Sequence, residues 1–372
     1  MKNVQFLMVG GGIGGLTCAI ALRRAGFEVD IIERDPTWSV YGVGIIQQSN
    51  VIRAMSQLGL IDDYLEAGFG FNEIDVFLPD GSHIARVPAP KLVEQYPANV
   101  GIGRKALQQV LSDRALGSGA TVRLGITVTD LADRGEEGVD VTFSDGSAGR
   151  YDAVIGADGL YSETRATLFP DAPKPAFAGQ SVWRYNFRRP ENVTTLMSFE
   201  GSVGMGIVPL APDLMYLFVT TPEPGNPRYP REGLAAAMRA KLADAAPFVA
   251  SLKEQIMDDE AVVYKPLETV FVDGPWYKGR TVLIGDAVHA TTPHLGQGAG
   301  MAIEDAIVLA EELSRQDSFE AAFEAFQARR FERCRYIVER SLAICNGQLG
   351  NSPPVDQAKA MREMFEVVSQ PI

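Results

Sequence analysis

Residues 6 to 35 read FLMVGGGIGGLTCAIALRRAGFEVDIIERD, and the architecture of the chain follows from this stretch. Glycine fills five of the six positions from Gly10 to Gly15, directly after a short apolar run. Residues 4 to 9 are apolar at nearly every position, which is typical of a buried parallel strand. A helix over 15–25 ends at Gly26, and EVDIIE forms the next strand. The pattern predicts a βαβ unit.

Three of the glycines, Gly10, Gly12 and Gly15, fit the pattern GxGxxG. The first allows a tight turn, the second lets a pyrophosphate approach the backbone, and the third lets the helix pack near the sheet. The pyrophosphate would lie on free N–H groups at the helix N-terminus. Glu33 follows at the distance needed to accept hydrogen bonds from ribose hydroxyls. The loop therefore predicts an adenine dinucleotide and leaves FAD and NAD both open. Its candidate ligands are Gly10, Gly12, Ile13, Gly14, Gly15, Glu33 and Arg34.

Composition narrows the possible partners. The 372 residues carry a net charge of −13, so the surface repels nucleic acid and anionic membranes. No run of about eighteen apolar residues occurs, so we expect no membrane span. Three cysteines, Cys18, Cys334 and Cys345, argue against a disulfide framework, and their spacing predicts no metal site. With no secretory leader in the sequence, the expected location is the cytoplasm.

The α/β texture is interrupted twice by β-rich segments, which predicts one nucleotide-binding domain with two insertions that build a second sheet. The expected nucleotide-binding domain spans 1–70, 100–175 and 267–346, the substrate domain spans 71–99 and 176–266, and 347–372 form a peripheral tail. Hairpins are expected at Asp80-Gly81 and Asp145-Gly146. Helices are expected over 50–66, 104–118, 231–256, 299–314 and 318–346.

Two further motifs bear on the choice of cofactor. DAVIGADGLYSETR (152–165) and GRTVLIGDAVHATTPHLGQGAGMAIEDA (279–306) place Asp158-Gly159 and Gly285-Asp286 at strand ends. Together with the glycine loop, these motifs resemble the FAD-dependent class A aromatic monooxygenases, which have the para-hydroxybenzoate hydroxylase fold. The resemblance covers most of the chain. It implies an α/β protein whose Rossmann-like FAD-binding domain carries an inserted antiparallel β-sheet substrate domain.

The resemblance also implies contacts along FAD. Asp286 can bind ribityl hydroxyls, and the turn from Gly296 to Gly300 would meet the flavin pyrimidine ring with a helix N-terminus. Arg104 matches an arginine at the diphosphate and ribose, and Val128 matches a backbone position at the adenine. The implied ligands beyond the first loop are Gly44, in a turn beside the flavin, Arg104, Val128, Asp158, Asp286, Pro293, Gly296, Gly298 and Ala299.

Some of these residues have simpler interpretations. Asp286 could be a helix cap, Arg104 a solvated helix-start residue, and Asp158 part of a plain strand-end turn. His289 matches a histidine common in the family, and we interpret it as structural.

The implied chemistry is oxygen insertion. NADH or NADPH reduces FAD, O2 adds to give a C4a-hydroperoxyflavin, and a small aromatic or N-heteroaromatic ring is hydroxylated. No second GxGxxG follows a strand, so the choice between NADH and NADPH stays open. The oligomeric state, monomer or homodimer, also stays open. The alternative is a reductase or oxidase of the same fold that inserts no oxygen. The halogenase signature WxWxIP is absent.

The inserted sheet is expected to supply the substrate pocket, although each of its large apolar residues could equally be core. Alternation puts Met205 with Ile207 on one face and Tyr216 with Phe218 on another. The pocket candidates are Trp183, Met205, Ile207, Tyr216 and Phe218.

Three residues are candidates for catalysis. Arg184 could bind a substrate carboxylate or oxyanion, or form only a surface salt bridge. His294 follows Pro293 at a position where urate-oxidising relatives carry an aspartate that resembles a general base. An ordinary histidine pKa near 6.5 would suit proton removal from a phenol or ring N–H, and the alternative is a residue that caps the loop. Gln297 could hydrogen-bond to substrate or flavin.

Overall fold

A six-stranded sheet lies at the centre of one half of the computed structural model, which describes residues 4–40, 42–201 and 204–372. This half contains the glycine loop. Its order is β18-β19-β12-β1-β2-β8, and only the β18–β19 pair is antiparallel. The strands are β1 (Gln5–Val9), β2 (Glu28–Glu33), β8 (Thr121–Leu124), β12 (Ala153–Gly156), β18 (Tyr277–Lys278) and β19 (Thr281–Leu283).

The two faces of this sheet have different covers, because alternate residues of a strand point to opposite sides. Phe6 and Met8 of β1 belong to the main core, whereas Leu7 and Val9 pack against a three-stranded β-meander. The main core is built with helices α1 (Ile13–Arg24), α4 (Arg104–Gly117), α9 (Gly298–Arg315) and α10 (Phe319–Gln348). The meander consists of β9 (Val128–Asp133), β10 (Val139–Phe143) and β11 (Ala148–Tyr151), with the short helix η1 (Gly135–Glu137).

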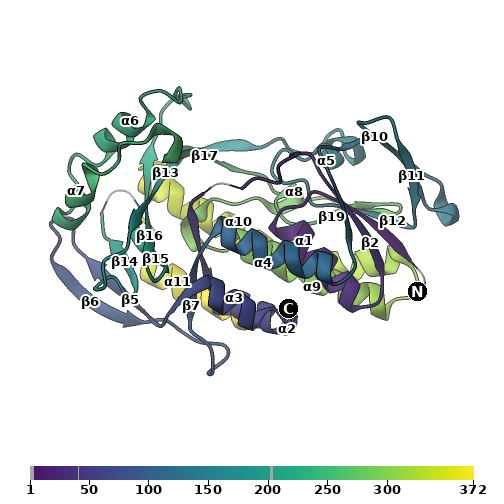
Figure 1. The fold of residues 1–372 in the computed structure, drawn as a ribbon, viewed down its shortest axis with the longest axis horizontal. Helices are drawn as coiled ribbons and strands as arrows, with labels where there is room; N and C mark the ends of the chain where they lie inside the picture. Colours follow the sequence, from purple (N-terminus) through teal and green to yellow (C-terminus); the bar gives the residue numbers. More distant parts are fainter. Residues whose placement is uncertain (1–3, 41, 202–203) are drawn as a thin grey trace.

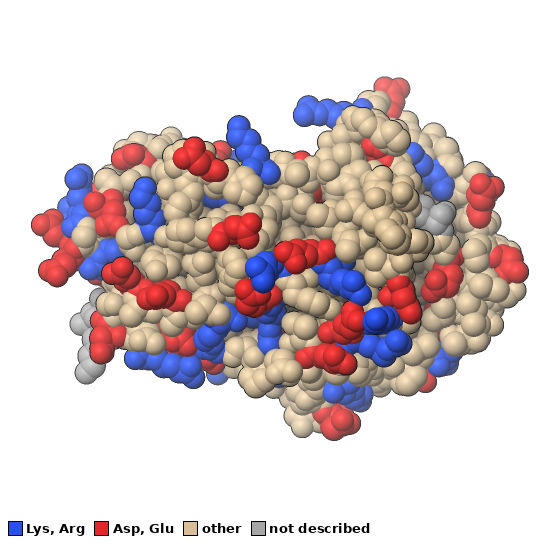
Figure 2. Space-filling view, turned by 180° about the vertical axis from the view of Figure 1, so that it is seen from behind, with Lys and Arg blue, Asp and Glu red and all other residues tan. Residues whose placement is uncertain are grey.

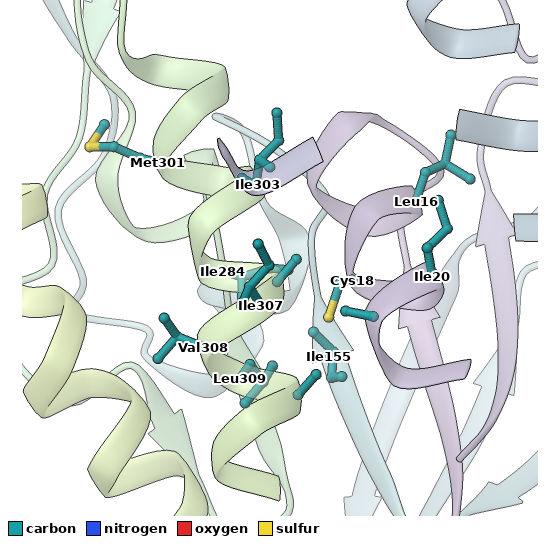
Figure 3. Close-up of a cluster of buried hydrophobic side chains, with 14 of the residues drawn as sticks. Leu16, Cys18, Ile20, Ile155, Ile284, Met301, Ile303, Ile307, Val308 and Leu309 are labelled. Carbon is teal, nitrogen blue, oxygen red and sulfur yellow. The ribbon is translucent and has the colours of Figure 1, made fainter. Parts of the chain in front are cut away.

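Helices α1 and α9 run side by side through the core (Figure 1). Leu16, Cys18 and Ile20 of α1 belong to the same buried apolar cluster as Ile303 and Ile307 of α9, and Cys18 lies on the side of α1 that faces α9 (Figure 3). The two helices approach closely near their N-termini, where a Cβ on Gly14 of α1 would lie 3.3 Å from Cβ of Ala302 in α9.

The second large sheet has seven strands in the order β17-β13-β16-β15-β14-β5-β6. Strands from both β-rich interruptions join it, and all neighbours are antiparallel except β14 and β5. Its strands are β5 (Glu73–Phe77), β6 (His83–Pro88), β13 (Ala176–Arg188), β14 (Leu196–Phe199), β15 (Met205–Ala211), β16 (Leu214–Pro222) and β17 (Val263–Thr269). Helices α6 (Leu234–Lys241) and α7 (Pro247–Lys253) cover its outer face (Figure 1). A short helix, η2 (Asp259–Ala261), precedes β17.

A small sheet joins the two halves. Strand β7 (Asn99–Gly103) pairs with β3 (Gly44–Gln48) on one side and with β4 (Gly68–Phe71) on the other. It approaches β15 so closely that a Cβ on Gly101 would lie 2.0 Å from the carbonyl oxygen of Pro209. The inner face of the seven-stranded sheet is therefore held against the half that contains the six-stranded sheet. Short helices α5 (Glu163–Leu168), α8 (Asp286–His289) and η3 (Pro293–Leu295) complete that half.

The fold class is confirmed, and three local predictions are corrected. The helix expected over 50–66 is two helices, α2 (Ser49–Gln57) and α3 (Ile61–Ala67), because Gly59 has a φ of +70° between them. The helix expected over 231–256 is likewise split, and Pro247 begins α7. The C-terminal residues are not peripheral, because α11 (Gln357–Ser369) buries Ala360, Met364 and Val368 in the main core.

The surface shows no segregation of charge on the face seen in Figure 2, where acidic and basic side chains are interspersed. The described helices are all too short or too polar to span a bilayer.

Candidate active site

The glycine loop contains two glycines that the chain itself requires. Gly10 has a φ of +109°, and a Cβ there would lie 2.4 Å from the carbonyl oxygen of Ala157. A Cβ on Gly15 would lie 1.9 Å from the carbonyl oxygen of Gly10. Both positions are closed by neighbouring backbone, so their role is to allow the strand, the turn and α1 to pack.

Gly12 is different, because its own chain leaves it open. It is exposed, its φ of −82° suits any residue, and a Cβ there would meet no atom within 4 Å. It is also the N-cap of α1, and no side chain caps the free N–H groups that follow, including those of Ile13 and Gly14. An open backbone cradle at an uncapped helix N-terminus fits an anionic diphosphate.

The peptide of Gly11 is fixed from both ends. Glu33 Oε2 accepts a hydrogen bond from Gly11 N at 2.8 Å. The carbonyl oxygen of Gly11 accepts hydrogen bonds from Trp38 Nε1 at 2.7 Å and from Gln108 Nε2 at 3.0 Å. The loop is thus held in one conformation before a ligand binds. Sequence reasoning missed Trp38 and Gln108, since neither belongs to a recognisable motif. Arg34 is exposed and lies 3.6 Å from Glu163.

Val128 and Asp158 are brought together, and both line a pocket of about 20 Å³. The Asp158 carboxylate accepts hydrogen bonds from the Ser162 hydroxyl and from the backbone and hydroxyl of Thr164. These bonds organise the start of α5. The structure therefore favours the strand-end turn as the role of the Asp158 side chain.

Asp286 lies at the start of α8, directly after Gly285. Its side chain is exposed, yet the protein packed around it raises its pKa by burial, while nearby His289 and Arg104 lower it. An accessible carboxylate surrounded by protein is placed to receive hydroxyl groups of a ligand. Together with the open cradle at Gly12, this carboxylate fits FAD.

Arg184 and Tyr216 approach this region from the substrate sheet. Burial, with a smaller contribution from the positive charge of Arg104, lowers the pKa of Arg184 to about 10, and Tyr216 opposes the shift. Burial in turn raises the pKa of the Tyr216 hydroxyl. Residues from β13, β16 and α4 therefore lie within electrostatic reach of one another.

The alternation of the inserted sheet corrects the expected pocket. Trp183 and Ile207 are fully buried in the outer apolar cluster beneath α6 and α7, and Met205 packs against that cluster. Tyr216 and Phe218 belong to the inner cluster instead, on the side facing the small sheet. The pairs predicted to share a face do so, but only Tyr216 and Phe218 remain pocket candidates.

Gly44 also differs from its expected place. It begins strand β3 and does not lie in a turn. A Cβ there would come within 2.4 Å of Leu210 and 2.7 Å of Tyr216, so glycine is needed where the small sheet meets the substrate sheet.

The turn after α8 leaves the N-terminus of α9 uncapped by any side chain. Pro293 begins η3, and Gly296 ends it with a φ of +67°. Gly298 and Ala299 follow as half-buried residues, and a Cβ on Gly298 would have only Thr291 nearby, at 3.6 Å. This second helix N-terminus is suited to stabilise negative charge on a ligand.

Gln297 points away from this opening. Its side chain is buried, and its Oε1 accepts from Asn50 Nδ2 at 2.9 Å. Its Nε2 donates to Gln48 Oε1 and, at 3.2 Å, to Asn50 Oδ1. The expected contact with substrate or flavin is therefore corrected, because the chain itself occupies both ends of the amide.

His294 is bound by neighbours on both ring nitrogens. Nε2 lies 3.1 Å from Oε1 of Gln180 and 3.1 Å from Oε1 of Gln348, which assigns the proton to Nε2. Nδ1 then accepts from the Thr292 hydroxyl at 2.9 Å. Burial lowers the pKa of His294 to about 4, so the ordinary value near 6.5 does not apply.

Comparison with known proteins gives a consistent result. A family model described as an FAD binding domain matches residues 3–341. A putative FAD-dependent monooxygenase of Bacillus subtilis is 31% identical over 96% of this chain and 96% of its own. The 2-heptyl-3-hydroxy-4(1H)-quinolone synthase of Pseudomonas aeruginosa is 31% identical over 92% of this chain and 89% of its own. The structure of Klebsiella pneumoniae HpxO with FAD and uric acid superimposes with a TM-score of 0.84 and 26% sequence identity. The match covers 99% of this chain and 93% of that chain.

Proposed function

Because the chain belongs to the family of FAD-dependent monooxygenases, we propose that it hydroxylates a small aromatic ring, with N-heteroaromatic rings as the preferred class. NADH or NADPH supplies the electrons and O2 supplies the oxygen atom. The ring class rests on two similar proteins, one named for a quinolone and one crystallised with uric acid.

One observation carries the substrate side of this proposal. Arg184 lies on the inner face of the inserted sheet, within electrostatic reach of Arg104 and Tyr216. A guanidinium with a pKa of about 10 is still protonated at neutral pH. It can hold a ring oxygen as an anion, and negative charge on that oxygen makes the ring a better nucleophile.

The cofactor side rests on residues that the chain leaves open. Bound FAD supplies electron transfer from the nicotinamide and activation of O2. The backbone at Gly12 would hold its diphosphate, Asp286 its ribityl hydroxyls, and the N-terminus of α9 its ring system. The other residues of the proposed cofactor site are Glu33, Arg104, Val128, Pro293, Gly296, Gly298 and Ala299.

His294 is the proposed proton acceptor, although its environment makes it a weak base. Its Nδ1 is the acceptor nitrogen and accepts a hydrogen bond from the Thr292 hydroxyl. A substrate O–H or N–H that replaced this hydroxyl would have Nδ1 within reach, while Gln180 and Gln348 held the opposite edge of the ring.

The test combines cofactor release with oxygen labelling. Denaturing the purified protein should release FAD into the supernatant. Phenols and hydroxylated N-heteroaromatics are then screened for stimulated NAD(P)H oxidation under ¹⁸O2. One labelled oxygen atom in the product supports hydroxylation, whereas product without label supports a reductase or oxidase of the same fold.

A variant of Arg184 tests the binding role. Arg184→Met should keep FAD and raise KM for the substrate found in the screen by roughly tenfold or more, as loss of a hydrogen bond to a charged group costs about 1.5–3 kcal/mol. An unchanged KM would remove Arg184 from the substrate site.

A further inference from the structure

We propose that Asn50 and Glu304 are positioning residues that hold the N-terminus of α9 in the conformation that binds the flavin. The inference rests on the proposed FAD site, because it concerns the helix end assigned there to the ring system. Asn50 lies outside the quoted motifs, and Glu304 lies within the 279–306 motif at a position to which the sequence assigned no role. They lie 254 positions apart in the chain, and Asn50 Nδ2 donates to Glu304 Oε1 at 3.0 Å.

Asn50 connects the carboxylate of Glu304 to the turn that precedes α9. The same Nδ2 also donates to Gln297 Oε1, and Asn50 Oδ1 accepts from Gln297 Nε2. Gln297 is the N-cap residue of α9. The pair of amides therefore fixes the peptide from which the first free N–H groups of the helix project.

The backbone is shaped to admit this arrangement. A Cβ on Gly300 would lie 2.8 Å from Gln297 Oε1 and 3.5 Å from Asn50 Nδ2. Only glycine leaves room for the folded-back amide and for Asn50. The turn is thus built around the hydrogen bonds between these two side chains.

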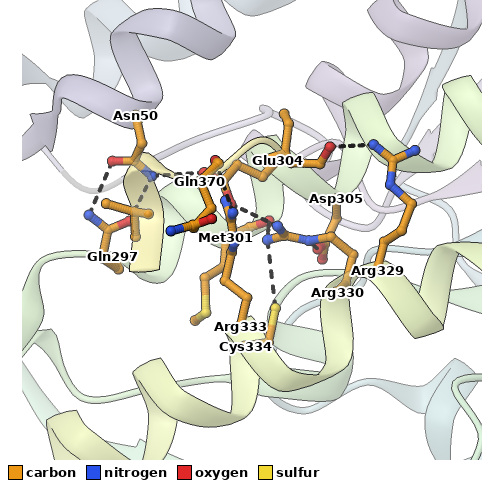
Figure 4. Close-up of polar contacts among 12 residues, drawn as sticks. Asn50, Gln297, Met301, Glu304, Asp305, Arg329, Arg330, Arg333, Cys334 and Gln370 are labelled. Carbon is orange, nitrogen blue, oxygen red and sulfur yellow. Dashed lines mark hydrogen bonds and ion pairs between the residues drawn. The ribbon is translucent and has the colours of Figure 1, made fainter. Parts of the chain in front are cut away.

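Glu304 is in turn anchored on α10. Its Oε2 accepts from Arg330 Nη1 at 2.8 Å and from Arg333 Nη1 at 3.2 Å, as the network in Figure 4 shows. Arg330 is fully buried, and Glu304 is 1% exposed. A carboxylate held by two arginines has little freedom, so the position of Asn50 is set by the packing of α9 against α10.

The carboxylate of Asp305, the next residue of α9, holds the turn at Gly285 that precedes Asp286. Asp305 Oδ2 accepts from the backbone N–H of Gly285 at 2.9 Å and lies 2.6 Å from His289 Nε2. Its Oδ1 accepts from Arg330 Nε at 2.7 Å. Adjacent residues of α9 thus hold different loops, Glu304 the turn at Gln297 and Asp305 the turn before Asp286, and Arg330 bridges them.

The side chains around Asp305 could also suggest a site for a metal ion. Ligand atoms of His289, Asp305 and Cys334 lie within 4.8 Å of one another. Arg330, however, donates to Asp305 and has its Nη2 3.6 Å from Cys334 Sγ. A buried guanidinium already supplies the positive charge, so the cluster acts as a scaffold for the loops.

Stability alone is a weak reason for such a network. Burying an ion pair costs desolvation energy that its attraction often fails to recover, and apolar residues of similar volume can be as stable. Hydrogen bonds that must be made in one geometry do specify a unique conformation. We therefore assign the network a role in presenting the helix end to the cofactor.

The test compares two identical substitutions on one helix. Glu304→Gln removes the charge that anchors Asn50. Glu312→Gln makes the same change eight residues later, about 12 Å along α9, at a carboxylate that is also buried and bound by arginines. Apoprotein of each variant is titrated with FAD, and the visible spectrum of the bound flavin and the Tm are recorded.

We expect Glu304→Gln to raise the Kd for FAD by about threefold to thirtyfold and to shift the flavin spectrum. Glu312→Gln should stay within about twofold of wild type even if its Tm falls. Asn50→Ala leaves both arginine contacts of Glu304 in place, and it should reproduce the effect on FAD even if Glu304→Gln does not fold.

Wild-type affinity and spectrum in Asn50→Ala would overturn the inference, as would equal losses in the two glutamate variants. If wild-type apoprotein binds no FAD at all, the proposed function fails as well. That outcome is distinct, because the inference alone fails when wild type binds FAD and the variants bind it equally.

Discussion

Substitution of Gly12 by alanine separates the needs of the cofactor from those of the fold. A Cβ on Gly12 meets no protein atom within 4 Å, and the backbone there is extended with a φ of −82°. The apoprotein should therefore tolerate the methyl group and gain about 0.4–1 kcal/mol from a stiffer unfolded chain. For a chain of this length the Tm of the apoprotein would change by about 1 °C.

The effect on FAD should be much larger. The methyl group would occupy the surface on which the diphosphate is proposed to lie, and overpacking of this kind costs about 1–3 kcal/mol. The expected loss of affinity is roughly fivefold to 150-fold. FAD titration of the apoprotein measures it, with flavin fluorescence as the signal.

Gly15→Ala is the matched control within the same loop. Its Cβ would lie 1.9 Å from the carbonyl oxygen of Gly10, so the strand, turn and helix must move apart. We expect this variant to lose stability as apoprotein, which urea unfolding measures. A Gly12→Ala protein that binds FAD as wild type does, or that unfolds as readily as Gly15→Ala, would refute the reasoning.

Three further predictions address the rest of the site. Asp286→Ala should raise the Kd for FAD about tenfold to a hundredfold, since it removes a charged acceptor for ribityl hydroxyls, and unchanged retention on a desalting column would contradict that role. The pKa of His294, about 4 in the folded chain and about 6.5 when unfolded, means that the unfolded state takes up a proton first as pH falls. The free energy of unfolding of wild type should therefore fall as pH falls from 6.5 to about 4, and that of His294→Gln should not show this fall. Equal pH dependence of urea unfolding in the two proteins would argue against the buried neutral ring. Met215→Ala, on the outer face, should lower the free energy of unfolding by about 2–5 kcal/mol and leave KM unchanged, and a raised KM would place that face in the pocket.

The cofactor half could be predicted from local pattern. GxGxxG after an apolar run, an acid at the end of the next strand, and Gly-Asp at a later strand end specify a βαβ unit and its nucleotide side, because helix and strand periods are local properties of the chain. The hairpin at Asp145-Gly146 followed in the same way, since a turn requires only a few adjacent residues.

The residues that complete the site were decided by tertiary structure. Trp38 and Gln108 reach one carbonyl oxygen from positions 27 and 97 residues away, and Asn50 meets Glu304 across 254 residues. No spacing rule records such contacts, because they depend on how whole elements pack.

The direction of each side chain was also beyond the sequence. Alternation paired Met205 with Ile207 correctly, but a period of two does not say which face of a sheet is covered by helices and which meets the flavin half. Gln297 turned inward for the same reason, as only the packed structure supplies Asn50 as its partner. The pKa of His294 likewise depends on burial and on Gln348, which arrive from other elements. Local patterns thus determined most of the elements and an adenine dinucleotide as the cofactor class, and packing between distant elements determined which side chains face the site.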